Sequence, residues 1–234
     1  MTKTDGIHVL AIGAHADDVE LGMGATLAKH AAAGQRAVIC DLTEAELSSN
    51  GTVEGRREEA EAAARILGVS RVNLQYPDRG FGVSDAFIRP LVALIRKLKP
   101  RVVCAPYWED RHPDHVTCSS LVTEAVFNAK IRKYDAEGLP AHTVSHLYYY
   151  YINGVGEASF VVPVSDVYEQ KVEALVAYAS QFSLQKNAVA TPLNETNYMG
   201  MIRGRDQIWG QQIGTAYGEG FVTRTPVSRA YLID

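Results

Sequence analysis

Two short segments, far from each other in the chain, contain closely spaced histidines and carboxylates. His15 and Asp18 are three residues apart just after a short apolar run, and His112 and His115 have the same spacing in the second segment. Two imidazoles and one carboxylate are a ligand set of catalytic zinc, which keeps a fourth position open for water. His15, Asp18 and His115 can supply that set, so these residue types predict a catalytic metal site.

The carboxylates of Asp17 and Asp18 are adjacent and repel each other unless a cation offsets one of their charges. A divalent ion is the simplest such cation, whereas an aspartate that only caps a helix needs none. An isolated H-x-x-H pair such as His112 and His115 can likewise be a pair of core or capping residues. The two clusters together favour the metal site, with Asp17 left beside the ion.

Four strand-and-helix units are expected to position these segments. The predicted strands and helices alternate: His8–Ile12, Val19–His30, Arg36–Leu42, Val53–Leu67, Val72–Tyr76, Asp85–Leu98, Arg101–Ala105 and Pro113–Phe127. Such units imply parallel strands with right-handed crossovers. We therefore predict a three-layer, Rossmann-like α/β sandwich with a mostly parallel central sheet and helices on both faces. Because ligands bind beyond the carboxyl ends of such strands, the two reactive segments should meet.

The pattern changes in the second half of the chain. Residues His146–Ile152 and Phe160–Val164 are predicted as strands, and Val167–Ser180 and Tyr198–Gly214 as helices. No stretch between the halves has the composition of a linker. We predict one domain over residues 1–234, in which 1–133 form the regular units and 134–234 complete the same domain.

Composition excludes several classes of partner. Lys plus Arg total 23 against 27 for Asp plus Glu, so the chain lacks the basic character of nucleic-acid-binding proteins. No apolar stretch reaches the roughly 18 residues that span a bilayer. Three cysteines without a C-x-x-C spacing suit a reducing compartment. We expect a cytoplasmic protein that binds neither nucleic acid nor membrane.

Two other functions fit part of the pattern. Asp41 ends the second strand, where a nucleotide-binding domain places a ribose-binding acid. However, the first turn lacks G-x-G-x-x-G, Gly22 and Gly24 lie inside the predicted helix, and Asp17 and Asp18 would repel a pyrophosphate. A sugar-binding protein that uses a metal without catalysis is the other alternative, and the spare Asp and His argue against it.

The paired motifs Ala14-His-Ala-Asp-Asp18 and His112-Pro-Asp-His115 resemble those of the LmbE-like, or PIG-L, family of zinc-dependent N-deacetylases. Residues Asp41–Gly51, Tyr76–Gly80 and Ala105–Arg111 resemble the subgroup that makes bacillithiol. That resemblance implies a homohexamer that removes acetyl from a small amino sugar, N-acetylglucosaminyl malate. Chitin oligomers, other N-acetylglucosamine substrates and thiol conjugates remain alternative substrates.

The resemblance also implies a role for each site residue. It implies one Zn²⁺ per chain, with Fe²⁺ as an alternative, held by His15, Asp18 and His115. Asp17 is implied as general base, and His112, oriented by Asp114, as the acid or the oxyanion partner. The other implied residues are Arg56 for substrate binding, Tyr198 near the oxyanion, and Arg111 reaching a neighbouring subunit's site.

Two further residues follow from the loop composition alone. Ser49 and Asn50 lie in the polar loop before the second predicted helix, where they can bind sugar hydroxyls or cap that helix. We predict that they contribute one contact to the substrate.

Overall fold

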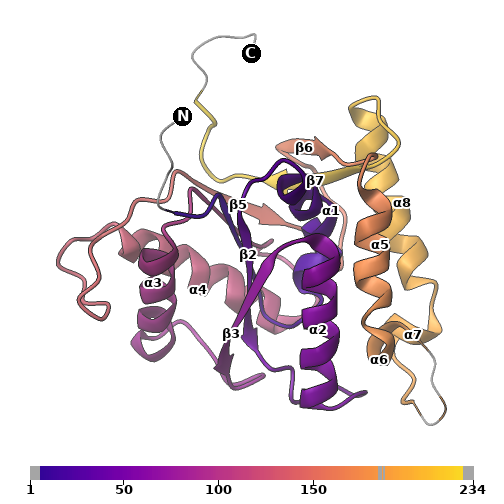
Figure 1. Ribbon diagram of the computed structural model, residues 1–234, viewed down its shortest axis with the longest axis horizontal. Helices are drawn as coiled ribbons and strands as arrows, with labels where there is room; N and C mark the ends of the chain where they lie inside the picture. Colours follow the sequence, from indigo (N-terminus) through magenta and orange to yellow (C-terminus); the bar gives the residue numbers. More distant parts are fainter. Residues whose placement is uncertain (1–5, 184–185, 187, 229–234) are drawn as a thin grey trace.

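The computed structural model describes residues 6–183, 186 and 188–228 (Figure 1). The strands are β1 (Val9–Gly13), β2 (Ala37–Thr43), β3 (Ser70–Tyr76), β4 (Val102–Pro106), β5 (His146–Tyr150), β6 (Phe160–Pro163) and β7 (Gly218–Val222). The helices are α1 (Asp18–Ala32), α2 (Val53–Leu67), α3 (Asp85–Leu98), α4 (Pro113–Ala129), α5 (Tyr168–Val176), α6 (Ala179–Phe182), α7 (Pro192–Glu195) and α8 (Tyr198–Gln212).

One seven-stranded sheet with the order β3-β2-β1-β4-β5-β7-β6 forms the centre of the molecule. The first five strands of this order are parallel, and β7 is antiparallel to both β5 and β6. The predicted α/β fold with a mostly parallel sheet is therefore confirmed. No helix in the described ranges has the length and apolar character needed to cross a membrane.

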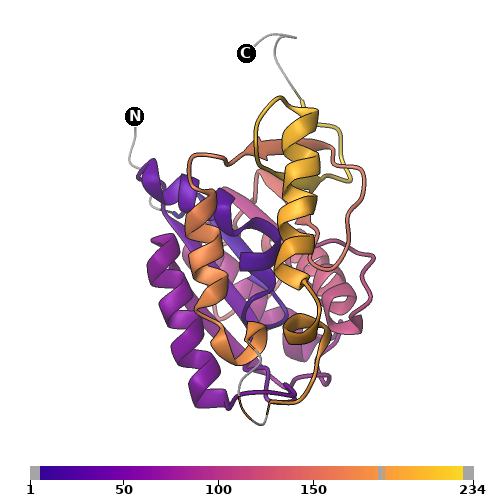
Figure 2. The same ribbon diagram turned by 90° about the vertical axis from the view of Figure 1, so that its right-hand side faces the viewer.

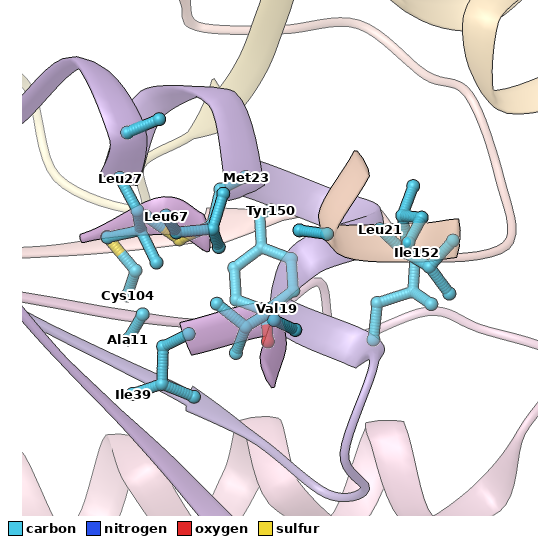
Figure 3. Close-up of a cluster of buried hydrophobic side chains, with 14 of the residues drawn as sticks. Ala11, Val19, Leu21, Met23, Leu27, Ile39, Leu67, Cys104, Tyr150 and Ile152 are labelled. Carbon is cyan, nitrogen blue, oxygen red and sulfur yellow. The ribbon is translucent and has the colours of Figure 1, made fainter. Parts of the chain in front are cut away.

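Helices cover both faces of the sheet (Figures 1 and 2). On one face, Leu10 of β1 belongs to the same buried cluster as Leu91 of α3 and Leu121 of α4. Helices α1, α2, α5 and α8 supply the cluster on the other face, where Tyr150 of β5 lies among side chains that include Val19 (Figure 3). All five residues of β1 are buried, as expected for a central strand covered on both sides.

Helix α1 is kinked at Met23, whose φ of −150° and ψ of 23° are not helical. The preceding residue, Gly22, packs against the ring of Tyr150, and a Cβ on Gly22 would lie 2.0 Å from Cδ2 of that ring. The Tyr150 hydroxyl donates to the carbonyl of Ile12 at 2.7 Å. The glycine thus lets α1 approach β5 closely, beside the end of β1.

A buried cluster of charges joins the second half of the chain to α1. Lys171 of α5 is fully buried and donates to Asp206 of α8 at 2.6 Å and to Glu219 of β7 at 2.7 Å. The Glu219 carboxylate also accepts from the backbone N–H groups of Ala25 and Thr26, at 3.1 and 2.6 Å. Glu219 therefore caps the part of α1 that follows the kink.

The structure corrects the element predictions in the second half. The predicted helix Val167–Ser180 is two helices, α5 and α6, because Tyr178 between them leaves the helical conformation and donates its buried hydroxyl to Glu20 at 2.9 Å. Strand β7 and the short α7 are absent from the prediction. The sequence of β7, Gly-Glu-Gly-Phe-Val, has a low strand propensity, and its pairing with β5 and β6 supplies the missing stabilisation.

Candidate metal-dependent active site

The segments after β1 and β4 meet at one edge of the sheet, as predicted from their positions at strand ends. The ring centroid of His15 lies 4.9 Å from that of His112 and 5.7 Å from that of His115. His112 and His115 stack at 4.8 Å at the start of α4, where His112 is the N-cap residue. Asp18 begins α1 directly beside them, so four side chains from two distant segments share one small volume.

The Asp18 carboxylate lies close to both His15 and His115. Oδ1 of Asp18 is 3.0 Å from Nε2 of His115, and Oδ2 of Asp18 is 3.6 Å from Nδ1 of His15. Ligand atoms around a tetrahedral zinc, each about 2.0–2.2 Å from the ion, lie about 3–3.5 Å from one another. Ring nitrogens of His15, His112 and His115 also lie within 4.8 Å of one another. The arrangement can therefore hold a metal ion.

Carboxylates next to His15 and His115 raise the pKa values of both imidazoles. Burial alone would lower the pKa of His115, but Asp18 and Asp110 raise it to about 9. The pKa of His15 is also raised by neighbouring carboxylates despite burial. A cation can replace the protons that these imidazoles otherwise carry, as metal binding commonly does.

Nε2 of His15 lies close to two carboxylates, which follow strands β3 and β4 in the chain. Nε2 of His15 is 3.2 Å from Asp78, which follows β3, and 3.4 Å from Asp114. A proton on Nε2 can be shared with these carboxylates, which leaves Nδ1 free to bind a metal beside Asp18. Asp114 also accepts from the side chain and, at 3.1 Å, from the backbone N–H of Arg79.

This arrangement changes the role expected for Asp114. The carboxylate of Asp114 faces His15 and Arg79, whereas only its backbone N–H contacts His112, donating to Nδ1 at 3.2 Å. Burial and the positive charges of His115 and His15 lower the pKa of His112. The carboxylate of Asp114 therefore supports His15, and Asp114 contacts His112 through its backbone N–H alone.

His115 has its own supporting carboxylate, which the sequence analysis missed. Nδ1 of His115 is 2.9 Å from Oδ1 of Asp110, which also accepts from the side chain of Asn153 at 2.8 Å. Burial would raise the pKa of Asp110, but these hydrogen bonds lower it to about 2. Oδ1 of Asn153 accepts from the Tyr198 hydroxyl at 2.8 Å. The signal that could have identified Asp110 and Asn153 is their position after β4 and β5.

Asp17 lies buried beside the three candidate ligands in an uncommon backbone conformation. Its φ of 107° falls where few residues other than glycine are found, and such strain is typical of functional sites. Burial raises the pKa of Asp17 to about 6, although Arg56 acts in the opposite direction. Nη2 of Arg56 lies 3.3 Å from the Asp17 carboxylate and donates to the carbonyl of Ala16 at 2.6 Å. A carboxylate with this pKa can accept a proton near neutral pH.

A cavity of about 260 Å³ opens over these residues. Its lining includes Tyr198, Ser49 and the arginines Arg56, Arg79 and Arg111, so the structure places four of the predicted substrate-side residues at the site. Asn50 is not among the lining residues. Its side-chain amide instead makes hydrogen bonds of 2.7 and 2.8 Å with the backbone of Val189, which tie two walls of the cavity together.

The groups that favoured nucleotide binding are engaged elsewhere. Both carboxylate oxygens of Asp41 accept from Arg71, at 2.6 and 2.7 Å, and the residue is 2% exposed, so this carboxylate belongs to an internal ion pair. Gly22 packs against Tyr150 inside α1 and does not form a phosphate-binding turn. The structure therefore disfavours the nucleotide-binding alternative.

Comparison with known proteins establishes the family. The sequence model of the family described as PIG-L, GlcNAc-PI de-N-acetylase, matches residues 10–126. This chain belongs to the PIG-L family. It is 31% identical over 189 residues to the diacetylchitobiose deacetylase of Thermococcus kodakarensis, a match that covers 74% of this chain and 70% of that protein.

Two solved structures are similar over most of their length. The conserved protein TT1542 from Thermus thermophilus is 36% identical, with a TM-score of 0.88 and coverage of 97% of this chain and 99% of that one. The N,N'-diacetylchitobiose deacetylase from Pyrococcus horikoshii is 28% identical, with a TM-score of 0.81 and coverage of 93% and 84%. The resemblance to PIG-L proteins and the predicted enzyme class, an amide hydrolase of the N-deacetylase type, are confirmed.

Proposed function

We propose that this PIG-L family protein is a zinc-dependent hydrolase that removes the acetyl group from an N-acetylglucosaminide. The observation that carries the proposal is the convergence of His15, Asp18 and His115 beside a buried carboxylate, Asp17, that is free of the ligand set. A base next to an open metal position is an arrangement that metal-dependent amide hydrolysis uses.

The candidate ligands His15, Asp18 and His115 would hold the ion. The chemistry that a bound zinc supplies is a water pKa lowered to about 7 and a polarised acetyl carbonyl. Fe²⁺ can use the same nitrogen and oxygen donors, so it remains an alternative to zinc in the same site.

The chain's own residues carry the proton transfers. Asp17 accepts the proton of the attacking water at its carboxylate, a role that general bases fill with gains of about 100-fold to 10,000-fold. Arg56 holds that carboxylate through its 3.3 Å contact. Nδ1 of His112 accepts from the backbone N–H of Asp114, so the neutral ring can donate a hydrogen bond from Nε2–H to the developing oxyanion, while Asp17 returns its proton to the leaving amine. Tyr198, which lines the same cavity, is the second candidate donor to the oxyanion.

The charge of the cavity supports an anionic glycoside such as N-acetylglucosaminyl malate. Arg56, Arg79 and Arg111 line the cavity, and of these Arg79 and Arg111 are exposed. A planar guanidinium pairs bidentately with a carboxylate. Ser49, which also lines the cavity, is the proposed contact to a sugar hydroxyl. The second candidate substrate is a chitin oligomer, which the similarity to two diacetylchitobiose deacetylases favours.

The proposal extends to assembly and location. The resemblance to the bacillithiol subgroup supports a homohexamer, and the exposed Arg111, which lines the cavity of its own chain, is its proposed contact with a neighbouring subunit. Three buried, free cysteines support work in the reducing cytoplasm. The sheet shared by both halves of the chain supports one domain over residues 1–234.

A deacetylation screen tests the substrate proposal. Release of free amine is measured for N-acetylglucosaminyl malate, free N-acetylglucosamine, diacetylchitobiose and longer chitin oligomers, with the zinc-loaded wild type. We expect the highest kcat/KM for the malate glycoside. A higher value for diacetylchitobiose would replace this substrate with the second candidate, and no amine release from any of them would contradict the proposed function.

A further inference from the structure

Arg205 of α8 is a buried guanidinium outside the catalytic cavity, and it binds three backbone carbonyls from two other segments. It is 2% exposed. Nη1 donates to the carbonyls of Tyr151 at 3.0 Å and Ile152 at 2.8 Å, and Nη2 donates to the carbonyl of Leu21 at 2.5 Å. One side chain therefore connects α8 to the loop after β5 and to the first part of α1.

The kink in α1 explains why the carbonyl of Leu21 is available. In a regular helix this carbonyl accepts from the N–H of Ala25, but that N–H donates to Glu219. Arg205 and Glu219 thus replace one helical hydrogen bond with two bonds to side chains. Because the regular hydrogen-bonding pattern is interrupted here, the turn that starts at Asp18 depends on Arg205 for its orientation.

Each segment bound by Arg205 also carries a residue of the catalytic site. Leu21 is one turn after Asp17 and Asp18, and Ile152 directly precedes Asn153. Asn153 donates its side-chain N–H to Asp110 at 2.8 Å and accepts from Tyr198 at 2.8 Å. The contacts lead from Arg205 through the backbone to the groups that orient His115 and Tyr198.

We propose that Arg205 is a positioning residue for the deacetylation reaction, acting through Asn153 and the first turn of α1. The inference rests on the proposed function. Removal of the guanidinium leaves three carbonyls without their donor and frees the two segments to shift relative to each other. Displacements of about 1 Å, and the loss of groups that orient metal ligands, each reduce activity or metal affinity by roughly 10-fold to 100-fold.

The principal test compares Arg205→Met with Arg203→Met, a matched change at an exposed arginine of the same helix. For Arg205→Met we expect kcat to fall about 10-fold to 100-fold, KM to change less than about 3-fold, and the zinc dissociation constant, measured by chelator competition, to rise about 10-fold. Arg203→Met should keep wild-type values. A folded Arg205→Met with wild-type kcat and zinc affinity would overturn the inference.

Two further variants make the test decisive. If Arg205 acts through Asn153, the double variant Arg205→Met/Asn153→Ser should have a kcat close to that of the single variant with the lower kcat. If the two single-variant losses in kcat multiply in the double variant, Arg205 does not act through Asn153.

If Arg205→Met fails to fold, Arg205→Lys takes its place in the test. One ammonium cannot donate to both segments as the guanidinium fork does, so a wild-type kcat of Arg205→Lys would overturn the inference.

The zinc measurement separates this inference from the proposed function. If the wild type and Arg203→Met release no amine, the proposed function has failed. The zinc affinities of the Arg205 variants still report in that case whether the guanidinium positions the site.

Discussion

Replacement of Asp17 by asparagine should leave the site assembled and remove hydrolysis. Asparagine is one of the few residues other than glycine that adopt positive φ readily, so the backbone conformation at 107° is retained. The amide oxygen can still accept from Arg56, which now lies 3.3 Å from the carboxylate. Because burial raises the pKa of Asp17, its charge destabilises the folded protein at neutral pH, and we expect the neutral asparagine to leave the free energy of unfolding unchanged or to raise it.

The expected loss of activity does not come from a loss of stability. An amide cannot take a proton from water, so the variant loses the whole contribution of the general base, about 100-fold to 10,000-fold in kcat. This corresponds to about 2.7–5.5 kcal/mol of transition-state stabilisation. Burial raises the pKa of Asp17 to about 6, which matches the proton affinity that this role needs.

The assay measures amine release and zinc content on the same preparation. Glu109→Gln is the matched control, since it neutralises an exposed carboxylate at the same edge of the sheet. It should keep wild-type kcat. An Asp17→Asn protein that holds one zinc per chain and retains more than about a tenth of wild-type kcat would refute the role of Asp17 as general base.

Four more substitutions test other parts of the account. His115→Ala should purify without stoichiometric zinc, and atomic emission that still finds one ion per chain would refute the ligand set. Arg56→Lys should lower kcat about 10-fold for the malate glycoside and for diacetylchitobiose alike, because the planar fork that contacts the Asp17 carboxylate and the carbonyl of Ala16 is lost; an unchanged kcat for both would contradict this role. Arg96→Met should lower the free energy of unfolding by about 2–4 kcal/mol in urea titrations and leave kcat unchanged, since this buried guanidinium donates to five backbone carbonyls. Gly22→Ala should lower the thermal midpoint, because its Cβ would lie 2.0 Å from Tyr150; an unchanged midpoint would contradict the packing.

The regular part of the fold could be predicted because its signals are local. Strands buried on both faces appear as short apolar runs, and the helices between them show apolar residues at helical spacing. Strand β7 gave no such signal, since its glycines and Glu219 form a strand only through pairing with β5 and β6. The break before α6 depends on the burial of Tyr178, which local spacing does not reveal.

The site shows the same division between local and tertiary information. His15, Asp18 and His115 could be predicted as ligands because closely spaced histidines and carboxylates follow two strands that end at one edge of the sheet. Asp78 and Asn153 are ordinary polar loop residues whose roles depend on which side chain lies opposite, His15 for the first and Asp110 for the second.

X-ray anomalous scattering at the zinc edge, from crystals of the metal-loaded protein, tests the central claim most directly. We expect one peak about 2.0–2.2 Å from Nδ1 of His15, a carboxylate oxygen of Asp18 and Nε2 of His115. A peak at Nε2 of His15 instead, between Asp78 and Asp114, would contradict the proposed centre.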